Sequence, residues 1–333
     1  MHSLQLGPLT IHFHRTVRVD PDKTSNLPPS LGHFEIYKVS DFKDQCPADW
    51  EPEGYFLAMH DKEAMWLSFS TEENEPVALL VGAGGINAVT GDKLGIKLAK
   101  DNYLVTPPQP WLDGWKGEDG SVFQFVTTEY KAGKGLTVGE QIMGEECKTG
   151  GMGFVVYTAK DRETLKAKSK PREVWGDSDD STLDYDKEEC NYAKGLKLCS
   201  FAAPVPASTR PKRDRAIAGG QSVNRVACSE VGVGKGGKIT QKIYPDPHGL
   251  EVWKTSPDRM MAVYLIDGVS FTQITGKPMP PMPKDVMDYI GKWYGLHDKE
   301  EKDVAGTDKF TGLATVFHTK EVQTQSDAQE TTT

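Results

Sequence analysis

Three prolines and two tryptophans stand within nine residues, at positions 107–115, between two apolar runs. Proline donates no backbone hydrogen bond, so this stretch cannot continue a helix or a central strand. We therefore expect a rigid corner. Its rings would offer preordered apolar surface, which makes it a candidate binding or interdomain surface formed by Pro108, Pro110, Trp111, Asp113 and Trp115.

Short apolar segments with glycine turns surround this corner. Residues 9–19 alternate, with Leu9, Ile11 and Phe13 on one face, which indicates a strand. Residues 77–81 are continuously apolar, as in a strand buried on both faces. Residues 55–59 and 64–70 suggest a hairpin, and residues 122–128, 136–143 and 153–158 suggest further strands. The chain is therefore predicted to be mainly β, with an antiparallel sandwich or barrel-like domain over residues 1–159.

The character of the chain changes at about residue 160. Residues 177–189 are acidic and residues 210–215 are basic, and such blocks bury too little apolar surface to offset chain entropy. We interpret residues 160–237 as a charged, largely flexible insert. The basic cluster is interpreted as solvated linker, with a localisation signal or a contact for an anionic partner as the alternative. Residues 319–333, rich in Thr, Gln and acidic residues, are expected to be a disordered tail.

A smaller α+β lobe is predicted over residues 238–318. It begins with a second proline-rich turn, residues 244–250, which adds Tyr244, Asp246 and His248 to the candidate surface. Residues 270–275 suggest a short helix that ends at Gly276, and residues 278–283 must be extended. An amphipathic helix is expected from residue 285 and a last strand near residues 313–318. We expect the two proline-rich turns to meet and to dock this lobe on the first domain.

Two glycine-rich stretches and one histidine pair resemble ligand-binding motifs only in part. The glycines of residues 82–87 lack the strand–turn–helix context of a dinucleotide-binding loop, and residues 232–238 lack the Ser or Thr that follows a phosphate-binding loop. His12 and His14 project from one strand face and could supply two metal ligands, but two ligands are a weak motif and a solvated strand face is the preferred interpretation. No Cys-x-x-Cys pair is present. No cofactor and no metal are therefore predicted.

Composition restricts the location and the partners of the chain. A net charge of −9 argues against general nucleic-acid binding, and no apolar run approaches the length of a membrane span. The N-terminal residues lack the pattern of a secretory signal, and five cysteines cannot all pair within the chain. We therefore expect a cytoplasmic protein.

Four strings together carry a family resemblance: residues 65–69, 85–91, 103–114 and 241–250. They resemble an uncharacterised family found in bacteria and fungi, several members of which are labelled hypothetical or integral membrane protein. The likeness covers about residues 5–155 and 238–297, and the charged insert has no counterpart in it. The resemblance implies no activity, cofactor or catalytic residue. The membrane label of that family conflicts with the hydropathy of this chain, in which no apolar run is long enough to span a bilayer. We therefore expect no membrane span.

The leading hypothesis is a non-enzymatic binding or self-assembling protein, with an unknown protein or a second copy as its partner. The rigid proline and aromatic turns favour it, because such surface loses little entropy on contact. The alternative is a hydrolase acting on a carbohydrate or other small substrate. Its catalytic groups would be Asp113, Asp246 or His248, in a cleft lined by Trp111 and Trp115. Convergence of the three polar groups in one pocket would distinguish the two hypotheses.

Overall fold

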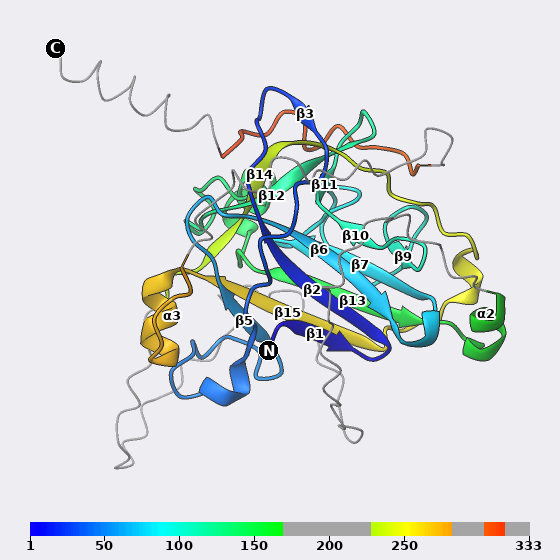
Figure 1. The fold of residues 1–333 in the computed structure, drawn as a ribbon, viewed down its shortest axis with the longest axis horizontal. Coiled ribbons are helices and arrows are strands. Elements are labelled where there is room, and N and C mark those ends of the chain that lie inside the picture. Colours follow the sequence, from blue (N-terminus) through cyan, green and yellow to red (C-terminus); the bar gives the residue numbers. More distant parts are fainter. Residues whose placement is uncertain (169–227, 282–302, 317–333) are drawn as a thin grey trace, which may run out of the picture.

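A computed structural model describes residues 1–168, 228–281 and 303–316, and its strands form two mixed sheets (Figure 1). The first sheet has the order β1-β2-β6-β12-β14-β3, with β10 beside β6 and β11 beside β12. Its neighbours are antiparallel except for β14 and β3. Its strands are β1 Ser3–Leu6, β2 Leu9–Thr16, β3 Thr24–Ser25, β6 Ala64–Thr71, β10 Trp111–Leu112, β11 Gly114–Lys116, β12 Ser121–Glu129 and β14 Val231–Thr240.

The second sheet has the order β4-β5-β15-β13-β7-β8, with β9 beside β7. Its neighbours are antiparallel except for β15 and β5. Its strands are β4 Tyr37–Lys38, β5 Tyr55–Ala58, β7 Val77–Ala83, β8 Ile86–Asn87, β9 Leu104–Thr106, β13 Met152–Thr158 and β15 Arg259–Ile266.

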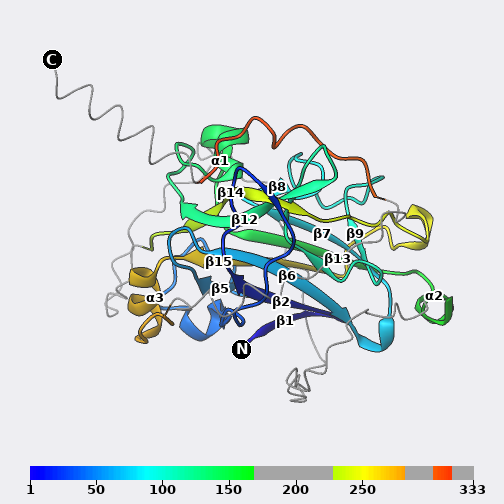
Figure 2. The ribbon, with the colours of Figure 1, turned by 45° about the horizontal axis from the view of Figure 1, so that its top comes forward.

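Helices are short and lie outside the sheets. In both ribbon views α2 and α3 lie at opposite ends of the molecule (Figures 1 and 2). None of the helices in the described ranges has the length and apolar composition that crossing a bilayer requires. The α-helices are α1 Val138–Met143, α2 Arg162–Lys168 and α3 Gly268–Thr275, and the 3-10 helices are Val39–Phe42, Glu72–Asn74, Gly144–Glu146 and Leu250–Val252.

The main core lies between the two sheets. Ile11 and Phe13 of β2 and Leu67 of β6 belong to the same buried cluster as Phe154 of β13. The rings of Phe13 and Phe154 meet edge to face at 5.8 Å between centroids. The predicted mainly β class is therefore confirmed, as two open sheets packed face to face across the described residues.

The strands after the insert belong to the same sheets as the strands before it. β14 pairs with β12 along most of its length, and β15 lies between β5 and β13. The predicted lobe over residues 238–318 therefore does not form a sheet of its own. Residues 231–237, predicted as flexible insert, are part of β14. The charged blocks, the expected helix from residue 285 and the tail lie outside the described residues.

Two further sequence predictions are wrong. Residues 55–59 and 64–70 do not form a hairpin, because β5 lies in the second sheet and β6 in the first. Residues 138–143, predicted as strand, form α1. The Thr137 hydroxyl accepts a hydrogen bond from the Glu140 amide, and the Glu140 carboxylate accepts one from the Thr137 amide, which is a capping box. The capping box starts a helix here, although the apolar pattern of residues 136–143 suggested a strand.

The glycines of residues 82–87 form a tight turn between two strands. Gly84 and Gly85 have φ angles of +55° and +76°, the left-handed region that glycine adopts without strain. They join β7 to β8, and no helix follows. A two-residue turn of this kind suits the right-handed twist of the strands it connects.

Candidate functional site

The two proline-rich turns lie in contact, as predicted. The Gln109 amide group donates to the carbonyls of Trp111 (2.9 Å) and Lys242 (3.3 Å), and its oxygen accepts from the Tyr244 amide (2.8 Å). From the other side, the Gln241 side chain accepts a hydrogen bond from the Asp113 amide and donates one to the Trp111 carbonyl. Both glutamines are completely buried. Two crossed amide side chains therefore hold the corner together.

Asp246 ties the second turn to its surroundings. Its Oδ2 accepts from the Tyr103 hydroxyl (2.5 Å) and the Trp253 indole (2.7 Å), and its Oδ1 accepts from the His248 amide (2.8 Å). The pKa of Tyr103 is raised, first by burial and then by this bond to the carboxylate. The two oxygens of Asp246 thus accept three hydrogen bonds, all of which hold the second turn in place.

The predicted site residues do not converge in a cleft. Asp113 and Trp115 are completely buried and Tyr244 is nearly so, whereas Pro108, Pro110, Trp111 and His248 are half-buried. The open pocket near α2 and the small cavity beside Pro280, both described below, are lined by none of them. The geometry therefore gives the hydrolase hypothesis no support from Asp113, Asp246 and His248. The corner is an architectural joint.

Asp113 is an unusual buried acid. Its side chain is completely buried, and neither carboxyl oxygen makes a hydrogen bond of acceptable geometry with a described group. Burial raises the pKa of Asp113 well above its usual range, and the adjacent Trp111 side chain offsets this only in part. The carboxyl is therefore neutral in the folded protein at a pH where it is ionised in the unfolded chain.

Replacing Asp113 with asparagine should weaken the pH dependence of stability. Above about pH 4 the unfolded chain releases the Asp113 proton while the folded protein keeps it, so stability falls as pH rises, by up to about 1.4 kcal/mol per pH unit. We expect Asp113→Asn to melt above the wild type at about pH 8, with the gain shrinking toward pH 4. Exposed Asp22→Asn serves as the control. An equal change in melting temperature at every pH would contradict the prediction.

The outer face of the first sheet carries a cluster of three histidines, His12 and His14 of β2 and His33 of the following loop. The His33 ring centroid lies 4.4 Å from that of His14 and 5.3 Å from that of His12. His14 stacks flat on Trp66 of β6, at 3.6 Å between centroids and 2° between planes. Its Nδ1 and Nε2 share hydrogen bonds with the hydroxyls of Ser30 (2.9 Å) and Ser68 (2.8 Å).

This cluster suits neither metal binding nor base catalysis. Both His14 nitrogens are engaged by hydroxyls, and within the described ranges no three His, Cys, Asp or Glu side chains are placed so that they could hold a metal ion. Burial, followed by the neighbouring His33 and His12, lowers the pKa of His14 to about 3. A general base works best with a pKa near the operating pH, so His14 is a poor partner for Ser68.

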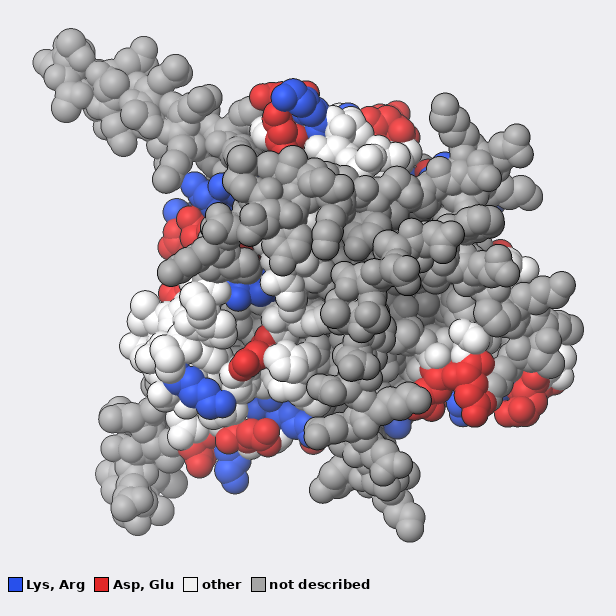
Figure 3. Space-filling model, viewed as in Figure 1, with Lys and Arg blue, Asp and Glu red and all other residues white. Residues whose placement is uncertain are grey.

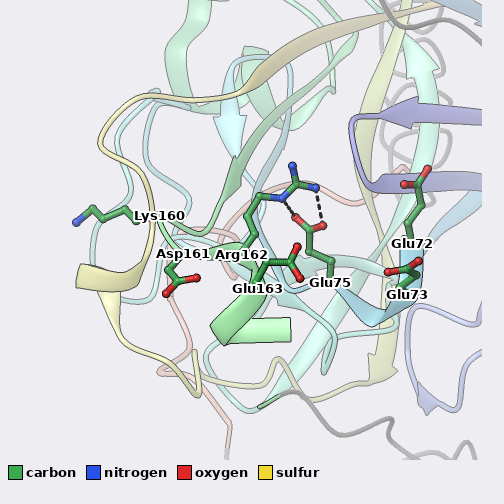
Figure 4. A pocket seen from close by; sticks show the side chains of 7 residues that line it. All are labelled: Glu72, Glu73, Glu75, Lys160, Asp161, Arg162 and Glu163. Carbon is green, nitrogen blue, oxygen red and sulfur yellow. Dashed lines mark hydrogen bonds and ion pairs between the residues drawn. The ribbon is translucent and has the colours of Figure 1, made fainter. Parts of the chain in front are cut away.

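An open pocket of about 510 Å³ lies between the 3-10 helix Glu72–Asn74 and the start of α2 (Figure 4). Arg162 binds Glu75 through two bonds of 2.5 and 2.6 Å, while Lys160 points away from this pair. Acidic and basic atoms lie side by side along the lower edge of the surface in Figure 3, without one large patch of a single sign. The pocket offers no unpaired buried group, and we assign it no ligand. Its lining residues are Glu72, Glu73, Glu75, Lys160, Asp161, Arg162 and Glu163.

A different site lies where β2, β4 and β5 end near α3, and it holds a peptide segment. Arg15 Nη1 donates to the Pro281 carbonyl and His60 Nε2 to the Pro280 carbonyl, each at 3.0 Å. Arg15 is 8% exposed, and its guanidinium lies over the Phe34 ring at 5.3 Å. We call residues 277–281 the strap, and call the proline groove the surface formed by Arg15, Phe34, Tyr37, His60 and Phe271.

Further contacts hold the strap along its length. Lys277 Nζ lies over the Tyr37 ring at 5.2 Å, a cation–π distance. Met279 packs against the buried cluster that includes Phe56 and Phe271. A small cavity of about 20 Å³, room for about one water, remains beside Pro280. The groove therefore meets the strap with a cation site, an apolar pocket and two donors for consecutive proline carbonyls.

A buried ion pair positions the groove donors. Arg15 Nε donates to Glu63 Oε1 at 2.6 Å, and Glu63 is only 3% exposed. The other Glu63 oxygen accepts from the His60 amide at 2.9 Å, which fixes the turn that carries His60. Sequence reasoning missed Arg15, His60 and Glu63. One signal was present: Arg15 continues the inward series Leu9, Ile11, Phe13, where an unpaired charge would be costly.

No family model, no curated protein and no solved structure matches this chain. Function is therefore inferred from the geometry of the described residues alone.

Proposed function

We propose that this chain is a non-enzymatic binding protein for extended, proline-rich peptide segments. The supporting observation is that Arg15 and His60 donate to two consecutive proline carbonyls of a segment already seated in the proline groove. Proline-rich segments adopt a preformed extended helix whose carbonyls are free to accept. Aromatic grooves with side-chain donors recognise such segments in many proteins at low entropic cost.

In this proposal the strap is a ligand bound in cis. The strap follows Gly276, which ends α3 with a left-handed φ of +70°, and runs straight into the groove. A segment tethered this close has an effective concentration of order millimolar, so it competes with any outside peptide. The partner expected from the sequence, an unknown protein or a second copy, would supply a similar segment in trans.

Peptide binding tests the proposal. The probe is a fluorescein-labelled peptide with the sequence of residues 276–284, titrated by anisotropy. In the variant Pro280→Gly/Pro281→Gly the strap loses its rigidity, at about 0.4–1 kcal/mol per proline. We expect this variant to bind the peptide about 4- to 30-fold more tightly than the wild type, because the competing strap is weakened.

Adding His60→Ala to the strap variant provides the matched control. It removes one carbonyl donor without leaving a buried charge unpaired, and should return the affinity toward the wild-type value. The melting temperature of each variant confirms that it is folded. Equal affinity of wild type and strap variant, or no effect of His60→Ala, would refute the proposal. Light scattering of the unliganded strap variant shows whether a second copy supplies the segment.

We also propose that this binding takes place in a reducing compartment, the cytoplasm. Cys46, Cys147 and Cys228 are free thiols in the described structure. Burial raises the pKa of both Cys46 and Cys147 to about 11, so these thiols stay protonated and unreactive at neutral pH. Free buried cysteines of this kind are usual in proteins that fold under reducing conditions.

A further inference from the structure

One short segment connects the histidine cluster to the proline groove. Residues 31–34 run antiparallel along the end of β2, on the side away from β6. Leu31 donates to the Arg15 carbonyl, Arg15 to the Gly32 carbonyl and Phe34 to the Phe13 carbonyl, each at 2.8 Å. Residues 14 and 33 face one another in this pairing. We call residues 30–34 the latch segment.

The latch segment has a different role on each of its faces. Neighbouring side chains of an extended segment point in opposite directions. His33 accordingly meets His14 and His12 on the outer face of the sheet, while Phe34 lies beneath the Arg15 guanidinium in the proline groove. A displacement that separates His33 from His14 would therefore also withdraw Phe34 from the groove.

We propose that the three histidines form an acid-sensitive latch: when they become protonated, the latch segment leaves β2 and the proline groove releases its ligand. The release of a partner peptide rests on the proposed function, whereas the release of the strap concerns the chain alone. The latch thereby makes the ligand affinity of the groove depend on pH.

The surroundings of His14 make a positive charge there costly. The groups that face it are His12 on its own strand, Trp66 and Ser68 on β6, and Ser30 and His33 on the latch segment. His2 adds a further repulsive charge near His12 and His33. Arg15 and Glu63 belong to the opposite face of the sheet and pair with one another. None of the groups that face His14 is a carboxylate that could compensate an imidazolium there.

Hydrogen bonding does not favour the neutral form of the three histidines over the protonated form. Burial and charge repulsion therefore determine how much their protonation costs in the closed latch. A serine hydroxyl can accept from an imidazolium as well as donate to a neutral ring, and both bonds of His14 can survive protonation. His33 Nε2 is buried without a hydrogen-bond partner, so protonation of this ring adds no hydrogen bond at that atom. Burial comes first among the causes that lower the pKa of His12, His14 and His33. Opening the latch removes Ser30 and His33 from the cluster and admits water to the three rings, which moves their pKa toward the usual value of about 6.5.

The size of the response follows from these pKa values. Between about pH 6.5 and pH 3 the open form binds more protons than the closed form, so acid favours opening. For His14 alone, lowering the pH from 7 to 5 should shift the equilibrium about 20- to 30-fold toward the open form. His12 and His33 act in the same direction.

Hydrogen exchange of the intact chain tests the latch directly. After correction for the intrinsic pH dependence of exchange, the amides of Leu31, Phe34 and Arg15 should exchange about 20- to 30-fold faster at pH 5 than at pH 7. His14→Gln should remove most of this increase. His33→Gln, at a half-buried position without a hydrogen bond on Nε2, is the second variant should His14→Gln fail to fold. His248→Gln, outside the cluster, should respond like the wild type.

The same experiment separates failure of the latch from failure of the proposed function. The latch is overturned if exchange of these amides does not rise in acid. It is also overturned if exchange rises as much in His14→Gln and His33→Gln as in the wild type. Exchange of the Lys277 and Met279 amides, the two strap residues that are not proline, must rise together with that of the latch segment, since otherwise the link to the groove is wrong. The labelled peptide should bind the strap variant more weakly at pH 5. Absence of peptide binding at both pH values refutes the proposed function and leaves the latch to be judged by exchange.

Discussion

Arg15→Met is expected to lower the free energy of unfolding by about 3–5 kcal/mol, the usual cost of breaking a buried ion pair from one side. Arg15 and Glu63 have side-chain exposures of 10% and 3%, and their atoms approach to 2.6 Å. Methionine keeps the apolar stem but leaves the Glu63 carboxylate buried with one lost partner. Urea unfolding followed by circular dichroism measures the change.

A second variant distinguishes an unpaired charge from lost packing. Arg15→Met combined with Glu63→Leu removes both charges and should recover much of the stability, because apolar replacements of buried pairs are often nearly neutral. The exposed pair Lys93–Glu146 is the matched control, and Lys93→Met should leave the unfolding midpoint unchanged. The prediction fails if the double variant is as unstable as Arg15→Met alone.

The core could be predicted from the sequence where side chains alternate along a strand. Leu9, Ile11 and Phe13 of β2 have this pattern, and all are buried between the sheets. Val19 continues this odd-numbered series in the alternating run of residues 9–19, but it belongs to a cluster on the outer face of the first sheet, because β2 ends at Thr16. Period-two patterning predicts a face only as far as the strand continues.

Sheet assignment was the harder problem. Adjacent strands in the sequence pair often enough to make a hairpin the natural expectation for β5 and β6. The turn between them instead crosses from one sheet to the other, and there it brings His60 and Glu63 to the groove. Nothing in the local sequence distinguishes such a crossing from a hairpin.

The corner was predictable and the groove was not. Two long proline-rich motifs separated by an insert suggested a contact, which Gln109 and Gln241 provide. The groove joins residues 15, 60 and 281. Residue 281 lies in the proline-rich run that was predicted to be extended, but residues 15 and 60 lie in no recognisable motif. A site assembled from isolated residues of distant elements becomes visible only when the fold brings them together.

Buried cations anchor the chain on both sides of residues 282–302. Arg15 binds the carbonyl of Pro281 at 3.0 Å, and Lys116, completely buried, binds the Asp303 carboxylate at 2.6 Å. From Asp303 the segment continues to Phe310, whose ring lies 5.2 Å from that of Trp115. This segment crosses the top of the molecule in both ribbon views (Figures 1 and 2). The last described part of the chain is therefore held by the corner where the first proline-rich turn ends.

Trp115→Ala should consequently destabilise the protein by about 3–5 kcal/mol, the range for truncating a large buried aromatic side chain. The Trp115 ring is completely buried and meets Phe125 edge to face at 5.2 Å. Its indole also donates to the Gly234 carbonyl at 3.3 Å, so β12, β14 and the segment around Phe310 each lose a contact with β11. Chemical unfolding gives the free energy, and near-ultraviolet circular dichroism should show loosened packing around the aromatic cluster.

Trp111→Ala is the matched control, four residues away on β10. Trp111 is half-buried and packs at the margin of the outer cluster around Leu27 and Ile239, so its truncation removes less buried area and should cost clearly less. The two tryptophans look equivalent in the sequence, but only Trp115 lies between the sheets. Equal losses of unfolding free energy from the two variants would contradict the prediction that Trp115 contributes more than Trp111.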